Sequence, residues 1–149
     1  MTQPILICYD GSSEAAGAID ACAALLGPRD TVVLTVVPAM TFAESMAASA
    51  SSVVPGGAFE DLNRAEALRI AEAGAAHARR AGLRAEARAE IASTTWQGIV
   101  DVADELDTGA IVIGSRGLAG FREFARGSVS HEVATHARRP VLIVPPAAA

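Results

Sequence analysis

The residues best suited to chemistry form a glycine- and serine-rich segment that runs from Gly114 to Ser128. The segment begins Gly-Ser-Arg-Gly, continues for nine residues and ends in Gly-Ser. The apolar run 110–113 precedes it, so a buried strand leads into a glycine turn and then into the start of a helix. A chain with this order can wrap its main chain around phosphate groups. The segment therefore predicts a phosphate-binding site.

Each part of this segment has a physical role in binding phosphate. Gly114 and Gly117 are expected to adopt positive φ and to let the main chain approach a ligand without an intervening Cβ. Gly127 and Ser128, at a helix start, would direct N–H groups and the positive end of the helix toward a phosphate. The helix dipole adds about 0.3–1 kcal/mol to those hydrogen bonds. Ser128 also supplies a hydroxyl donor.

Asp10 follows the first apolar run of the chain and is the second candidate binding residue. An ionised carboxylate only accepts hydrogen bonds, so Asp10 suits ribose hydroxyls or an exocyclic amine and would repel a phosphate. The alternative is an ordinary turn or helix-entry carboxylate before Gly11. If the strand order of the sheet reverses between the first and fourth strands, Asp10 faces Gly114.

Alternating strand and helix signals predict the elements that must hold these residues. Strands are expected at 5–10, 31–37, 83–91, 110–113 and 141–144, the third of them half-exposed at a sheet edge. Helices are expected from Ser12 or Ser13 to Gly27, over 59–81, from Thr94 or Thr95 to before Gly109, and over 128–137. Residues 39–58 are expected to form a flexible connector or binding loop. The pattern is typical of an α/β fold, an open doubly wound parallel sheet with helices on both faces.

Composition limits the function classes. With 149 residues, 51% of them hydrophobic, the chain is expected to form one domain, 1–149. The start lacks the features of a signal peptide, and no apolar stretch approaches the roughly 20 residues of a membrane span. These features predict a soluble, cytoplasmic protein that does not bind membranes.

The charged residues also restrict the partners. All twelve basic residues are Arg, which excludes a Walker-type phosphate loop and lysine Schiff-base chemistry. Residues 114–139 hold five Arg and two Glu, a net charge of +3, which leaves seven Arg and fifteen acidic residues, a net charge of −8, elsewhere. A nucleic acid would be repelled by most of this surface, whereas one compact anion could bind locally.

The other reactive side chains favour packing roles. Cys8 and Cys22 lie on apolar stretches and are expected to be core thiols. Trp96 is expected to anchor the core. His131 and His136 stand five residues apart, outside the spacing that brings two metal ligands onto one helix face, and His77 is expected to be isolated.

Two parts of the sequence resemble a known family. The run GSRGLAGFREFARGSVSH at 114–131, followed by RPVLIVP at 139–145, resembles the C-terminal half of the universal stress protein family. The start ILICYDGSS at 5–13 resembles that family's first strand and turn. The spacing of Gly114, Gly117, Gly127 and Ser128 matches the family's ATP-binding branch.

This resemblance implies a five-stranded Rossmann-like sheet, of the adenine nucleotide alpha hydrolase type, with strand order 3-2-1-4-5. It also implies a sensor or regulator of the stress response that binds an adenine nucleotide, ATP with or without Mg²⁺, or cyclic AMP in a variant. Asp10 would bind the ribose or adenine, and Val37 would meet the adenine edge. The remaining nucleotide-binding residues implied are Cys8, Ile113, Gly114, Arg116, Gly117, Gly127, Ser128 and Val129.

Members of this family often form homodimers through the fifth strand, which here would be Val141, Leu142, Ile143 and Val144.

Two functions other than nucleotide sensing stay open. An enzyme that hydrolyses ATP would need charge stabilisation at the γ-phosphate and a positioned nucleophile, but no lysine and no carboxylate pair stand beside the glycine segment. A dimeric interaction module without nucleotide is the third, and the complete glycine pattern argues against it.

Overall fold

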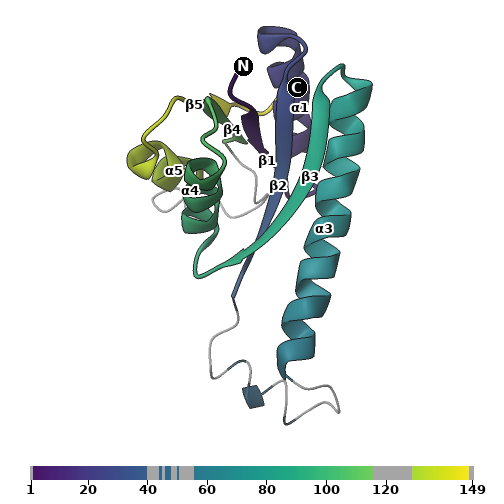
Figure 1. The fold of residues 1–149 in the computed structure, drawn as a ribbon, viewed down its shortest axis with the longest axis vertical. Coiled ribbons are helices and arrows are strands. Elements are labelled where there is room, and N and C mark those ends of the chain that lie inside the picture. Colours follow the sequence, from purple (N-terminus) through teal and green to yellow (C-terminus); the bar gives the residue numbers. More distant parts are fainter. Residues whose placement is uncertain are drawn as a thin grey trace.

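The chain folds around a five-stranded sheet (Figure 1). The computed structural model describes residues 2–39, 44, 46, 47, 50, 56–115 and 129–147. The strands of the sheet are β1 (Ile5–Cys8), β2 (Asp30–Pro38), β3 (Arg84–Ala92), β4 (Ala110–Gly114) and β5 (Val141–Val144). The helices are α1 (Ser13–Leu26), α3 (Gly56–Arg80), α4 (Thr95–Glu105) and α5 (Val129–His136).

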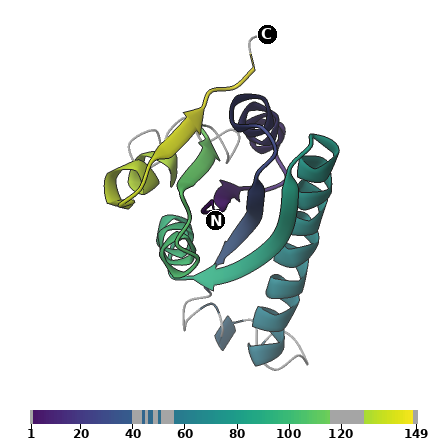
Figure 2. The ribbon, with the colours of Figure 1, turned by 45° about the horizontal axis from the view of Figure 1, so that its top comes forward.

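All pairings in the sheet are parallel, and the strand order is β3-β2-β1-β4-β5. Figure 2 shows α1 and α3 on one face of the sheet and α4 and α5 on the other. Each face has its own core. Ile7, Ile19 and Val33 belong to the cluster under α1 and α3, and Leu6, Leu34 and Ile99 belong to the cluster under α4 and α5. The predicted doubly wound α/β sheet is therefore confirmed.

The capping residues read from the sequence start the helices as predicted. Ser12 caps α1, since its hydroxyl accepts a hydrogen bond from the Ala15 N–H at 3.1 Å. Thr94 caps α4 in the same way, with the Gln97 N–H as donor at 3.3 Å. Gly82 follows α3 with a φ of +103°, a value that glycine adopts without a steric penalty.

Several boundaries differ from the prediction. β1 ends at Cys8 rather than at residue 10, because Asp10 turns its carboxylate back to the start of α1. β2 includes Pro38, which is tolerated because β1 has ended before this point and β2 has one open edge there. α3 begins at Gly56, inside the predicted connector 39–58. The low helix propensity of two successive glycines hides this start in the sequence.

The outer strand β3 confirms the predicted edge. Within the described residues it pairs only with β2, and its residues alternate between the two faces. Ala85 is buried against α3, whereas Arg88 and Glu90 lie on the α4 side. β2 and β3 stay paired as far as Pro38 and Ala92, four positions beyond the last pairing of β1, Cys8 with Leu34.

Candidate functional site

The strand order reverses beside β1, which has β2 on one side and β4 on the other. In open parallel sheets, ligands bind at the carboxyl ends of strands at such a point. Asp10 follows the end of β1, and Gly114 ends the neighbouring β4. The structure thus brings Asp10 and Gly114, the first residue of the glycine segment, to the ends of adjacent strands.

The turn from Tyr9 to Gly11 is held by main-chain hydrogen bonds. The Tyr9 N–H donates to the Leu34 carbonyl at 2.8 Å, and the Thr35 hydroxyl donates to the Tyr9 carbonyl at 2.7 Å. Gly11 has a φ of +87°, so a glycine is needed there. The two hydrogen bonds fix the chain just before Asp10, and the φ of Gly11 sets the direction of the chain just after it.

Asp10 itself is exposed at the entrance to α1. Its Oδ1 accepts a hydrogen bond from the Ser12 N–H at 2.9 Å, which is the geometry of an Asx turn. This bond orients the carboxylate while leaving it accessible to solvent. The geometry is compatible with both roles considered for Asp10, a ligand for ribose or adenine and a turn carboxylate.

Gly114 lies at a close approach of β4 to α1 and does not have a left-handed conformation. The expected positive φ is wrong, because glycines with positive φ among the described residues are Gly11, Gly27 and Gly82. Gly114 instead continues β4 opposite Val144, and the next residue donates its N–H to the Val144 carbonyl at 2.9 Å. A Cβ at Gly114 would lie 3.3 Å from the Glu14 carbonyl oxygen.

Glu14 therefore lies beside the start of the glycine segment. No acidic residue was predicted beside the segment from its own sequence, because Glu14 and Gly114 are far apart along the chain. The Glu14 carboxylate accepts a hydrogen bond from the Ser13 hydroxyl at 3.1 Å. The first turn of α1 thus carries one acidic side chain next to Gly114, in addition to Asp10 just before the helix.

Three further candidates are described, and their side chains belong largely to the protein interior. Ile113 is buried and Cys8 and Val129 are half-buried, all in the core cluster under α4 and α5. Any nucleotide contact of Ile113 would therefore come from its main chain. Burial raises the pKa of the Cys8 thiol to about 12, and the negative charge of Asp10 adds to this shift.

Val37 lies near the end of β2, opposite Ile91 of β3 and three positions beyond Leu34, the last residue of β2 that pairs with β1. It is half-buried on the extension of the two strands beyond β1. Arg116, Gly117, Gly127 and Ser128 lie outside the described residues. α5 begins at Val129, directly after Ser128.

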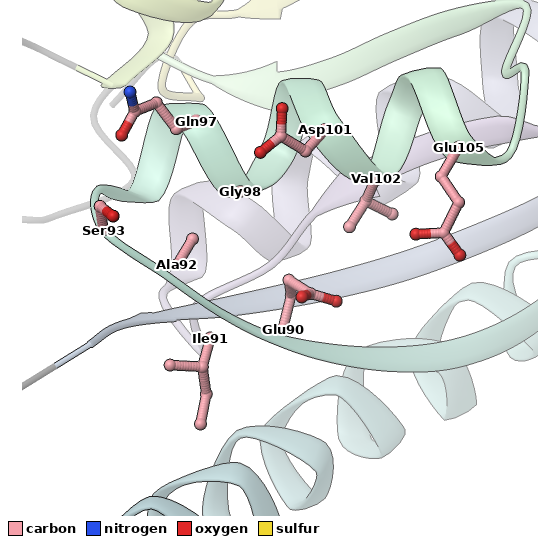
Figure 3. A pocket seen from close by; sticks show the side chains of 9 residues that line it. All are labelled: Glu90, Ile91, Ala92, Ser93, Gln97, Gly98, Asp101, Val102 and Glu105. Atoms are coloured by element: carbon pink, nitrogen blue, oxygen red, sulfur yellow. The ribbon is translucent and has the colours of Figure 1, made fainter.

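A pocket of about 310 Å³ lies away from this site, between the end of β3 and α4 (Figure 3). Its acidic side chains are Glu90, Asp101 and Glu105. Arg88 donates to Glu105 at 2.8 Å and to Glu90 at 3.2 Å, and the bond from Arg88 lowers the pKa of the Glu105 carboxyl. Sequence reasoning missed this pocket, and its one signal was the alternation of Arg and Glu in β3.

The histidines and cysteines are placed largely as expected. His77 is the exception: it is not isolated, because its Nε2 lies 2.7 Å from Asp20 Oδ1 of α1. The His136 ring stacks on Trp96 at a centroid distance of 4.3 Å, and half-buried Trp96 packs against the core. Both cysteines are free thiols. The part of the chain that the structure describes holds no group of three side chains able to bind a metal ion.

Comparison with known proteins identifies the family. The model of the universal stress protein family matches residues 1–145. The universal stress protein YxiE of Bacillus subtilis (strain 168) is 32% identical over 149 residues, which cover 97% of this chain and 99% of YxiE. None of the helices in the described ranges is long and apolar enough to cross a membrane.

Solved structures share the fold. The hypothetical protein MJ0577 has a TM-score of 0.77 and 21% identity, with 100% of this chain and 99% of that one covered. A universal stress protein in complex with cAMP has a TM-score of 0.67 and 22% identity, with 97% of each chain covered. The universal stress protein from Archaeoglobus fulgidus in complex with dAMP has a TM-score of 0.63 and 24% identity, with 95% of this chain and 97% of that one covered. The family match over nearly the whole chain and the likeness to YxiE show that this chain belongs to the universal stress protein family.

Proposed function

We propose that this protein binds an adenine nucleotide, with ATP as the first candidate, and acts as a cytoplasmic sensor or regulator in a stress response. The observation that carries the proposal is the position of Asp10 and Gly114 at the carboxyl ends of adjacent strands where the strand order reverses. The glycine segment that follows Gly114 has the spacing expected for phosphate binding. Two structural neighbours are complexes with adenine nucleotides, cAMP and dAMP.

The nucleoside and the phosphates of the ligand would be bound by different parts of the chain. Asp10 would accept hydrogen bonds from ribose hydroxyls or the adenine amine, since its carboxylate is exposed and held by the Ser12 N–H. Val37 would contact the adenine edge. Gly117, Gly127 and Ser128 would bind the phosphates through main-chain N–H groups, with Arg116 as a further phosphate partner.

The two acidic residues at the start of α1 bear on the choice of nucleotide. Asp10 and Glu14 would repel a phosphate close to the strand ends, so the phosphates are expected to extend toward the glycine segment and α5. A Mg²⁺ ion on the phosphates would offset this repulsion. ATP binding is therefore expected to strengthen when Mg²⁺ is added, whereas cyclic AMP, with a single negative charge, is expected to respond little.

The first experiment uses protein purified without added nucleotide. The protein is denatured with acid, and any released nucleotide is identified by chromatography and mass spectrometry. ATP near one per chain would support the proposal, and ADP alone would favour an ATP-hydrolysing enzyme. Protein that is empty and also fails to bind added ATP or cyclic AMP in calorimetry would refute nucleotide binding and favour an interaction module.

We also propose that the protein forms a homodimer through β5. Within the described residues β5 pairs only with β4, so its outer edge offers main-chain groups for pairing. Ile143 is 41% exposed on this strand, whereas Leu142 packs against the core under α1 and α3. Ile143 is therefore the better position at which to test the dimer.

A further inference from the structure

α3 carries a glycine where a helix would ordinarily avoid one. Gly74 lies well inside this 25-residue helix, where glycine is less favourable than alanine. A Cβ at Gly74 would lie 2.6 Å from Tyr9 Cδ1 and 2.8 Å from Tyr9 Cγ. It would also lie 2.9 Å from Val33 Cγ1. The Tyr9 ring therefore rests directly on the helix main chain, and any side chain at position 74 would collide with it.

A second residue of α3, Ile70, lies beside the same turn. A Cβ at Gly11 would lie 3.8 Å from Cγ2 of Ile70, which precedes Gly74 by one turn of α3. Tyr9 and Gly11 are the two neighbours of Asp10 in the sequence. Successive turns of α3 thus lie beside the residues immediately before and immediately after Asp10, with the closer approach at Tyr9.

We propose that α3 sets the position of the Asp10 turn through the packing of Tyr9 on Gly74, so that these two are positioning residues for nucleotide binding. The effect on affinity rests on the proposed function. On the side that faces the sheet, the main chain of Tyr9 is held by two hydrogen bonds: its N–H donates to the Leu34 carbonyl, and its carbonyl accepts from the Thr35 hydroxyl. On the side that faces α3, Tyr9 is held by the packing of its ring on Gly74. An outward shift of the ring would move Asp10 relative to Gly114 on the neighbouring strand.

The test is Gly74→Ala, with Gly17→Ala as the matched control. Gly17 lies inside α1, and nothing stands within 4 Å of a Cβ built there. We expect Gly74→Ala to weaken ATP binding at least fivefold in calorimetry, and Gly17→Ala to change it less than twofold. A purely structural role for Gly74 predicts lower stability with unchanged affinity, so unfolding by urea is measured on the same samples.

A double-mutant cycle isolates the tyrosine ring. Tyr9→Val removes the ring but leaves Val33 in contact with position 74. In the Tyr9→Val background, Gly74→Ala is therefore expected to lower stability still but to leave the affinity within twofold. An equal loss of affinity in both backgrounds would overturn the proposal. If Gly74→Ala does not fold, Tyr9→Val alone serves as the test, because loss of the ring should also weaken binding, and unchanged affinity would overturn the proposal.

A second measurement separates this inference from the proposed function. Tyr9 is the only tyrosine in the sequence, so protein labelled with [¹⁵N]tyrosine gives one amide signal in a nitrogen–proton correlation spectrum. Gly74→Ala is expected to move that signal, and Gly17→Ala is expected to leave it in place. An unmoved signal in Gly74→Ala would overturn the inference. A moved signal in a protein that binds neither ATP nor cyclic AMP would support the coupling of α3 to the turn and refute nucleotide binding.

Discussion

Gly98 leaves α4 no room for an added methyl group where this helix packs on the sheet. Gly98 lies in α4 against the extension of β2 and β3, and a Cβ there would lie 2.7 Å from Val36 Cγ1 and 2.9 Å from Ala92 Cβ. Gly98→Ala gains about 0.5–1 kcal/mol of helix propensity. Overpacking of a filled site costs about 1–3 kcal/mol. We therefore expect a net loss of stability between zero and about 2.5 kcal/mol.

Gly17→Ala makes the same chemical change in a helix without the steric contact. It is expected to raise stability by about 0.5–1 kcal/mol, so the two variants should differ by about 1–3 kcal/mol. For a chain of this length that is a difference of about 2–12 °C in Tm.

The assay is urea unfolding followed by circular dichroism, with the slope m compared between variants. Equal stability of Gly98→Ala and Gly17→Ala would refute the reasoning, because the contacts of Val36 and Ala92 would then have no energetic consequence. A stability difference with unchanged m would show that the effect arises in the folded state, where the added methyl group meets Val36 and Ala92.

The remaining predictions concern the phosphate segment, the sheet edge and the buried thiol. Gly117→Val should abolish ATP binding, since it adds a branched side chain where phosphate oxygens are expected, and should leave the oligomeric state intact; an unchanged calorimetric titration would contradict the site assignment. Ile143→Lys should convert the dimer to a monomer in light scattering because it places a charge on the outer strand, and an undisturbed dimer would exclude pairing through β5. The raised pKa of Cys8 means that the folded chain keeps a proton that the unfolded chain loses above its ordinary value of 9.0, so stability should fall between about pH 9 and 12. Cys8→Ala should lose less stability than the wild type over that range in urea unfolding, and parallel losses would show that another group is responsible.

The features predicted correctly from sequence are those set by local chemistry. The caps Ser12 and Thr94 act on N–H groups three residues away, so a short window of sequence contains both partners. The turn before α1 is local in the same sense, since Asp10 bonds the N–H two residues further on. Apolar runs likewise identify buried strands, and their alternation with helices leaves few possible topologies.

The features that were missed depend on partners far away in the sequence. Asp20 contacts His77 from another helix, so an apparently isolated histidine is paired. Arg88 of β3 reaches Glu105 of α4, and this bridge lies beside the acidic pocket. No periodic pattern indicates the partner in either contact, because each partner depends on how two elements pack after the sheet has formed.

Glycine illustrates why the site could be predicted only in part. A glycine in a sequence can indicate a positive φ, a close approach of two elements, or neither. Gly11 is required for its φ of +87°, Gly74 leaves room for the Tyr9 ring, and Gly17 has no neighbour within 4 Å of an added Cβ. Gly114 was expected in the first class and belongs to the second. An alanine substitution separates these classes, since it is strained at positive φ, overpacked at a close approach and stabilising where neither applies. Applied to Gly117 and Gly127, alanine substitutions that left nucleotide affinity unchanged would show that the phosphate segment does not require glycine at either position.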